Sequence, residues 1–207
     1  QMFYYYAMDM FGRVPLVLSS AEQLHSSLFQ GQTDRSSIFQ FVFQELQQVL
    51  PSLPDQHSNK EGNYYGRITQ PVVNFLLAKL ALNAEIYMYD DWTQGYASRP
   101  KGSDIHFSVP ASDASLRNGD KVDCRKLNAW ETCIYYCDKL AAEGYVLESD
   151  DSFNFSTHNE TSKENIFTIP MDKNIYTNQF HYLFRSYHYT HGGVLGLSLI
   201  HISEPTR

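Results

Sequence analysis

The most constraining feature of the sequence is the stretch of residues 71–87, which is apolar almost all round a helix. Thr69 precedes it as an N-cap, and Pro71 suits the first turn, where its missing N–H leaves no hydrogen bond unmade. A helix with one apolar stripe can lie on a surface, whereas a helix that is apolar all round must be covered on several sides. We therefore expect this helix to be the most buried element of the fold.

Two helices are predicted before it. The first covers residues 2–11 and ends at Gly12, because a residue that adopts positive φ easily closes the last turn of a helix. The second begins at Asp34 or Ser36 as N-cap and has apolar residues at spacings of three and four over residues 38–50. The second helix is amphipathic, with polar residues on its other face: Gln40, Gln44, Glu45, Gln47 and Gln48.

A fourth helix is predicted to begin at Asn128, with Glu131 completing a capping box, and to end at Gly144. Its expected buried face consists of Trp130, Cys133, Ile134, Cys137, Leu140 and Ala141. Small residues would allow close antiparallel packing of this helix on the central one: Ala78, Ala81, Ala84, Ala129, Ala141 and Ala142.

The segment between these two helices, residues 90–125, has no periodicity and is rich in Gly, Pro, Ser and Asp. Long segments of this kind are commonly functional loops or disordered. Tetratricopeptide repeats join their two helices by a short turn, so this pair would be such a hairpin with a long insertion. The predicted fold class is all-α: tetratricopeptide-like helical hairpins with long loop insertions and little or no β structure.

Composition and charge exclude several classes of protein. The 43% of hydrophobic residues can bury a core, and the net charge of −7 argues against a broad basic surface for nucleic acid. Cys133 and Cys137 lie one helical turn apart, where a disulfide would strain the helix. No apolar run reaches the roughly 18 residues that span a bilayer. The surplus of 15 Tyr over 2 Trp favours surfaces that are apolar on one face and wet at the edge.

Both ends of the chain are expected to differ from a complete native protein. The sequence starts at Gln1 within a helix that has no N-cap, which indicates a missing upstream segment. Residues 197–207, LSLIHISEPTR, match the translation of a sequencing-adapter end, and we exclude them from the fold. The expected organisation is therefore a partial helical domain over residues 1–196, followed by the non-native residues 197–207.

Five short motifs follow one another along the chain. They are Phe11-Gly12-Arg13-Val14-Pro15-Leu16 after an aromatic helix, Leu50-Pro51 at a helix end, Tyr65-Gly66-Arg67-Ile68-Thr69 before an Ala-rich helix, Glu143-Gly144-Tyr145-Val146-Leu147, and Glu164-Asn165-Ile166-Phe167. Their order is similar to that in the SusD/RagB family of surface glycan-binding lipoproteins. Each motif alone is short, so the resemblance depends on all five occurring in this order over most of the chain.

The resemblance implies an all-α fold built on tetratricopeptide-like hairpins and an outward-facing lipoprotein of the outer membrane. Its lipid anchor and part of its C-terminal half would lie outside this chain. It also implies a glycan ligand and partnership with a SusC-like TonB-dependent transporter in nutrient uptake. Members of the family bind rather than convert their ligand, so we expect no catalytic residue, no cofactor and no metal.

The segment around Trp92 is the main candidate for glycan contact. Trp92 and Tyr96 are suited to stacking on a sugar ring, and Asp90 and Asp91 are suited to binding its hydroxyls. The alternative, that Trp92 folds back over the central helix, stays open. Tyr64 is a further candidate, although the resemblance places its neighbourhood at a helix entry and so favours a packing role.

Metal-binding and catalytic alternatives have weaker support. The residues that suggest a metal are His181, His188, His191, Asp104, Asp113, Asp120 and Asp123. No carboxylate keeps a fixed spacing to the histidines, and the aspartates lack the order of ligands in a calcium-binding EF-hand loop. A glycoside hydrolase would need two carboxylates about 5–10 Å apart across a cleft. The sequence fixes no such pair.

A tetratricopeptide-like scaffold for a protein partner is the main alternative to glycan binding. Binding by such a scaffold would not depend on the Trp92 and Tyr96 rings, which distinguishes the two hypotheses.

Overall fold

The computed structural model describes residues 2–18, 31–111, 124–156 and 158–170. The chain divides into two compact units, Gln1–Thr168 and Ile169–Arg207. All the helices and strands named below lie in the first unit. Of the second unit, only Ile169 and Pro170 are described, so residues 197–207 and the metal candidates His181, His188 and His191 lie outside the described part.

The first unit is predominantly helical, as predicted. Its α-helices are α1 (Met2–Phe11), α3 (Arg35–Val49), α4 (Gln70–Leu82), α5 (Ala84–Tyr87) and α6 (Ala129–Ala142). Short 3₁₀ helices are η1 (Leu50–Ser52), η2 (Trp92–Gln94), η3 (Tyr96–Ser98), η5 (Asp151–Phe155) and η6 (Asn159–Thr161). No helix among the described residues has the length and apolar character that crossing a membrane requires.

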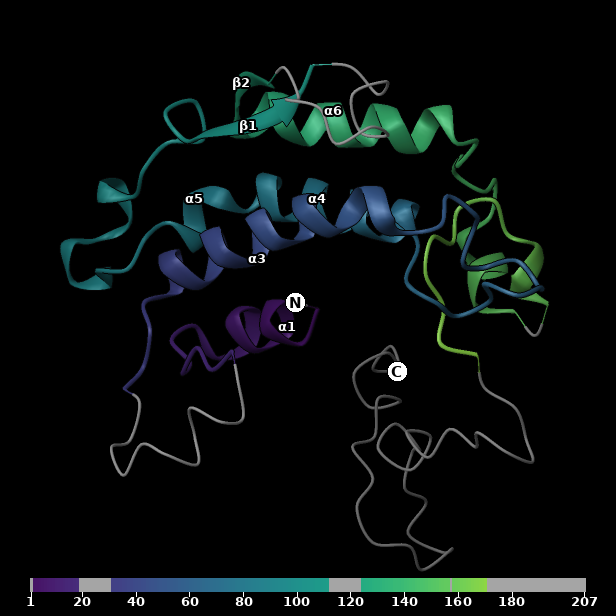
Figure 1. Cartoon of the computed structure of the whole chain (residues 1–207), viewed down its shortest axis with the longest axis horizontal. Coiled ribbons are helices and arrows are strands. Elements are labelled where there is room, and N and C mark those ends of the chain that lie inside the picture. Colours follow the sequence, from purple (N-terminus) through teal and green to yellow (C-terminus); the bar gives the residue numbers. More distant parts are fainter. Residues whose placement is uncertain (1, 19–30, 112–123, 157, 171–207) are drawn as a thin grey trace, which may run out of the picture. The chain divides into compact units, whose positions relative to one another are not determined.

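Helix α4 lies between α3 and α6, and α1 packs on another side of α3 (Figure 1). The buried residues of α4 are Pro71, Val72, Val73, Asn74, Leu76, Leu77, Ala78, Leu80 and Ala81. Full burial of a Leu or Val side chain stabilises a fold by roughly 1.5–3 kcal/mol. The predicted central, buried helix is confirmed, except that Asn83 separates α4 from α5.

Helices α4 and α6 run antiparallel and are joined by polar contacts at both ends. At one end, the Asn74 amide donates to Oε1 of Glu143 at 3.3 Å. At the other, the Glu85 carboxylate accepts from the Gly102 N–H at 2.7 Å, and the Gly102 carbonyl accepts from the Ala129 N–H at 3.0 Å. The segment between the helices is therefore tied to α5, which follows α4, and to the start of α6.

The buried face of α6 differs from the predicted one. Its buried residues are Ala129, Thr132, Tyr136 and Leu140. The predicted face was wrong for its exposed members, Trp130, Ile134, Cys137 and Ala141, whereas Cys133 is half-buried. The helix is rotated because Tyr136, which the apolar pattern had not counted, is only 1% exposed and contributes more buried surface than the cysteines. Among the alanines of α6, Ala129 is buried and Ala142 is exposed.

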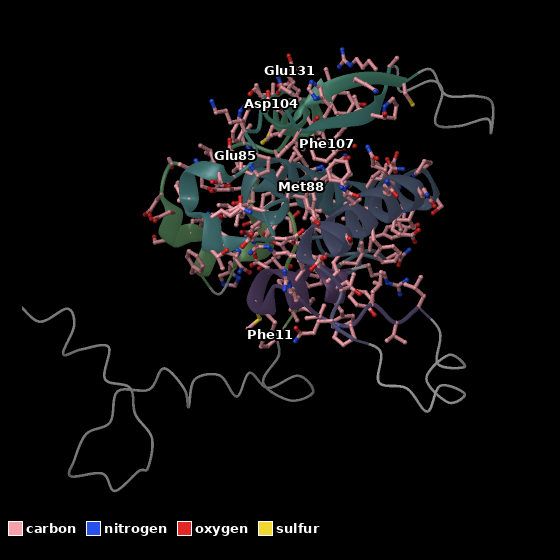
Figure 2. The ribbon with its side chains drawn as sticks, turned by 90° about the vertical axis from the view of Figure 1, so that its left-hand side faces the viewer. Phe11, Glu85, Met88, Asp104, Phe107 and Glu131 are labelled. Atoms are coloured by element: carbon pink, nitrogen blue, oxygen red, sulfur yellow. The ribbon has the colours of Figure 1, made fainter. Side chains whose placement is uncertain are left out.

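A β-hairpin lies within the insertion, where little or no β structure was predicted. Strand β1 (His106–Pro110) pairs antiparallel with β2 (Cys124–Asn128). Val109 is fully buried, and the Phe107 ring stacks on that of Phe43 with centroids 4.2 Å apart. Figure 2 shows Phe107 between the hairpin and the helices. These contacts fix the hairpin to α3.

The predicted helix ends are confirmed at three positions. Gly12 and Gly144 adopt φ of 71° and 90°, which a residue without a Cβ adopts at low cost. At the start of α6, Asn128 and Glu131 each accept a hydrogen bond from the backbone N–H of the other, both at 2.9 Å. Asp34 occupies the N-cap position of α3, but its side chain makes no capping hydrogen bond.

Candidate functional site

A pocket of about 720 Å³ lies between the C-terminal end of α1, the start of α3 and the segment after α5. It is lined by Asp9, Met10, Phe11, Gly12, Arg13, Gln32, Arg35, Tyr89, Asp90, Asp91, Trp92 and Thr93. Three of the five predicted glycan-contact residues therefore come together here. Aromatic rings, carboxylates and guanidinium groups share one concave surface, which we call the Trp92 pocket.

One wall is held by contacts between α3 and the segment after α5. The Arg35 guanidinium donates to the carbonyls of Ile86 and Tyr89, at 2.6 and 2.8 Å. The Asp90 carboxylate accepts from the Ser36 backbone N–H at 3.1 Å and from the Ser36 hydroxyl. Asp90 therefore caps α3 from a distant part of the chain. Its carboxylate is engaged by protein groups, which limits its part in binding a sugar.

Trp92 forms the aromatic part of this wall. Its side chain is half exposed, at 49%. The Arg35 guanidinium lies 5.1 Å from the ring centroid, and the Tyr89 ring meets it edge-on with centroids 4.8 Å apart. The ring is thus supported by protein contacts while half of its surface stays open to solvent. The ring packs on Arg35 of α3 and on Tyr89, and its contact with a glycan stays a prediction.

Asp91 orders the turn that carries Trp92. Its carboxylate accepts from the Thr93 hydroxyl at 2.6 Å, the Thr93 backbone N–H at 3.1 Å and the Gln94 amide at 2.8 Å. The hydrogen bond from the Thr93 side chain, followed by that from Gln94, holds the pKa of Asp91 below its ordinary value. Asp91 is exposed and charged at neutral pH, and its hydrogen bonds stabilise the 3₁₀ helix η2.

The opposite wall is the end of α1. Met10 and Phe11 are 72% and 73% exposed, which is unusual for large apolar side chains at one place. Arg13 forms an ion pair with Asp34 (Nε to Oδ1, 3.2 Å) and donates to the Asp90 carbonyl at 3.3 Å. Arg13 therefore links the end of α1 to both other elements of the pocket.

Tyr96 and Tyr64 are not among the residues that line this pocket. Tyr96 is 60% exposed in η3, with the Arg99 guanidinium 3.6 Å from its ring centroid. Tyr64 is 36% exposed and lies in the loop before α4. The structure therefore separates the predicted set into a group around Trp92 and two isolated tyrosines.

The sequence did not identify Phe11 and Arg13 as pocket residues. Both fell within a motif that signalled a helix end and a family resemblance. No local pattern indicates that the chain returns to them about 80 residues later, a separation seen in the Arg13 to Asp90 contact with its spacing of 77.

Among the residues that the structure describes, no group of three or more His, Cys, Asp or Glu side chains is placed to hold a metal ion. Asp104 is exposed, whereas Asp113, Asp120 and Asp123 lie outside the described residues. The three cysteines are free thiols, and burial raises the pKa of Cys133 to about 11.

No family model, curated protein or solved structure matches the chain.

Proposed function

We propose that the protein binds glycans at the Trp92 pocket, as an outward-facing outer-membrane lipoprotein of the SusD/RagB type. Its partner is a SusC-like TonB-dependent transporter, and its role is nutrient uptake without catalysis. In this proposal, α4 and α6 are the two helices of a tetratricopeptide-like hairpin. The segment between them supplies one wall of the binding site.

The observation that carries the proposal is the half-exposed Trp92 ring on the wall of a pocket of about 720 Å³. A sugar presents an apolar C–H face and a rim of hydroxyls, so it needs a ring to stack on and polar groups beside that ring. The exposed Gln32 side chain also lines the pocket, and its amide can both donate hydrogen bonds to hydroxyls and accept them.

The site is also held in shape before a ligand arrives. Arg35 supports the Trp92 ring from α3, and Asp91 fixes the η2 turn through three hydrogen bonds. A preorganised ring costs less conformational entropy on binding than a mobile one. The lower entropy cost favours binding of a neutral sugar, which has no charge to strengthen its contacts.

The test is affinity electrophoresis of the whole protein through gels that contain starch, xylan, β-glucan, galactan or mannan. Retention on at least one polysaccharide is expected, and Trp92→Ala should weaken it about tenfold or more, since stacking contributes 1–3 kcal/mol in comparable aromatic contacts. Phe155→Ala is the matched control, because Phe155 is 87% exposed and does not line the pocket. Absence of retention on every gel, or equal loss in both variants, contradicts the proposal.

Fluorescence offers a second measurement because the chain has only 2 Trp. Trp130→Phe leaves Trp92 as the sole reporter, and a bound glycan should shift its emission. A hydrolysis assay on the polysaccharide that binds tests the absence of catalysis: release of reducing ends by pure protein would show turnover.

A protein-binding scaffold remains the second candidate, favoured by the exposed apolar residues of α1. Phe3 is 90% and Met10 72% exposed. Such residues at the surface commonly mark protein contacts. Binding of a protein partner that is abolished by Phe3→Ala but unaffected by Trp92→Ala, without any glycan binding, would favour this candidate.

A further inference from the structure

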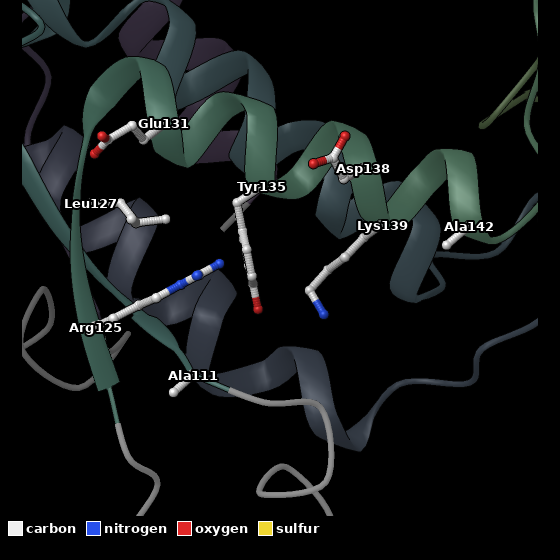
Figure 3. A pocket seen from close by; sticks show the side chains of 8 residues that line it. All are labelled: Ala111, Arg125, Leu127, Glu131, Tyr135, Asp138, Lys139 and Ala142. Atoms are coloured by element: carbon white, nitrogen blue, oxygen red, sulfur yellow. The ribbon is translucent and has the colours of Figure 1, made fainter.

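A second pocket, of about 520 Å³, lies between strand β2 and helix α6, on residues that the Trp92 pocket does not use (Figure 3). Tyr135 of α6 stands in it with Arg125 of β2 on one side and Lys139 of α6 on the other. The sequence pattern predicts no role for any of these three residues.

Tyr135 is held in place by strand β1 and by its own helix. Its hydroxyl donates to the Pro110 carbonyl at 3.3 Å, and its ring meets that of Tyr136 edge-on, with centroids 5.0 Å apart. Because Tyr136 is almost fully buried, this contact attaches the pocket to the core. The position of the Tyr135 ring is therefore fixed by contacts with the hairpin and with Tyr136 of the core.

The Arg125 guanidinium and the Lys139 ammonium group both lie near the Tyr135 ring. The Arg125 guanidinium carbon is 5.3 Å and the Lys139 ammonium nitrogen 5.0 Å from the Tyr135 ring centroid. They are therefore at most about 10 Å apart. Arg125 is exposed and forms no ion pair within the described part of the chain. A guanidinium in this state is suited to bidentate binding of a carboxylate.

Carboxylates also line the pocket, which constrains the ligand further. Figure 3 shows the Glu131 and Asp138 carboxylates close to α6, whereas the Arg125, Tyr135 and Lys139 side chains extend into the open space. The Glu131 carboxylate accepts a hydrogen bond from the Asn128 backbone N–H at 2.9 Å. Asp138 would repel a densely charged polyanion but accepts hydrogen bonds from hydroxyls.

We propose that this pocket is a second binding site that recognises an acidic saccharide. The carboxylate of one sugar unit binds Arg125, and the carboxylate of a second acidic unit of the same oligosaccharide approaches Lys139. The inference rests on the proposed function in taking the ligand to be a glycan. The site itself is separate from the Trp92 pocket, so each can be disabled without touching the other.

The experiment is isothermal titration of the whole protein with trigalacturonic acid and with neutral galactotriose. Arg125→Gln should weaken binding of the acidic trisaccharide about tenfold or more, because a charge-assisted bidentate contact is lost. Trp92→Ala should leave that binding unchanged. Lys126→Gln is the matched control, since Lys126 follows Arg125 on the same exposed strand and does not line the pocket. Arg125→Lys should restore part of the affinity, and the thermal midpoints should show that all variants fold.

Each other outcome overturns the inference in a recognisable way. Absence of acidic-trisaccharide binding, or equal binding of galactotriose at this pocket, removes the carboxylate preference. Equal losses in Arg125→Gln and Lys126→Gln indicate general surface charge. A loss only in Trp92→Ala indicates one binding site and leaves the proposed function intact. Failure of the proposed function itself is seen separately, as absent or Trp92-independent retention on the neutral polysaccharides.

Discussion

The Asp90 carboxylate accepts hydrogen bonds from both the backbone N–H and the hydroxyl of Ser36, although the two residues are 54 positions apart. Side chains that cap a helix usually come from its own N-cap position. In α3 that position is Asp34, whose side chain pairs with Arg13 instead. The first turn of α3 is thus completed by the segment that forms the Trp92 pocket.

Replacing Asp90 should therefore destabilise the protein more than replacing the residue at the N-cap position. We expect Asp90→Ala to lower the free energy of unfolding by about 1–2 kcal/mol, the usual effect of losing a cap. Asp34→Ala removes only an exposed ion pair and should cost less than about 1 kcal/mol. Urea denaturation of the two variants checks the difference, and a larger loss in Asp34→Ala would contradict this account.

Gly102 should not tolerate a methyl group. A Cβ at this position would lie 2.4 Å from Cε2 of Trp130, and the Gly102 N–H and carbonyl are both hydrogen-bonded. Because the backbone cannot move away freely, Gly102→Ala should cost about 1–3 kcal/mol, as overpacking does elsewhere. Gly31→Ala is the control, since a Cβ there meets nothing within 4 Å. Calorimetric melting should show that adding Trp130→Ala relieves much of the Gly102→Ala defect.

The contribution of Glu85 to the free energy of unfolding should depend on pH and be lost in acid. The Gly102 N–H, followed by Arg99, holds the pKa of Glu85 below its ordinary value of 4.5. A pKa that is lower in the folded state means that the contribution is complete above pH 4.5 and is lost as the pH falls through the lowered value. Glu85→Gln should be less stable than wild type at pH 7, and the gap should narrow at pH 3. A gap that stays constant across this range would count against the assignment.

Phe11 should contribute to glycan binding from the α1 wall. Phe11→Ala should weaken retention on the polysaccharide that binds by about threefold to tenfold, because it removes apolar contact area from the pocket. Phe3→Ala provides the comparison, since Phe3 lies on the same helix, is 90% exposed and does not line the pocket. Affinity electrophoresis of both variants measures the effect, and an equal change in the two would exclude a specific role for Phe11.

Periodicity predicted the helices well because each has a local signal. Gly12, Pro71, Asn128 and Gly144 act on the turn in which they stand, so their effect is visible in a few neighbouring residues. The hairpin lacked such a signal. Strand β1 alternates through Phe107 and Val109 alone, and β2 has Leu127 as its one large apolar residue. Two short strands of this kind resemble a polar loop until they pair.

The Trp92 pocket could be predicted only in part. Trp92, Asp90 and Asp91 are neighbours in sequence, so a short segment was enough to suggest them. Phe11, Arg13 and Gln32 join them only through the packing of α1 and α3, which the sequence pattern does not specify. The rotation of α6 was mispredicted for a related reason, because two adjoining faces of that helix each carry apolar residues and the choice is made by Tyr136 in the core.

The polar ties at the two ends of the α4–α6 pair have a consequence for alignment. Burial of apolar surface is not directional, whereas a hydrogen bond fixes the distance between two particular atoms. A shift of α6 by one turn, about 5.4 Å, would separate Asn74 from Glu143 and Ala129 from Gly102 at the same time. The hydrogen bonds at the ends thus add to the packing of the core in fixing the register of the two helices.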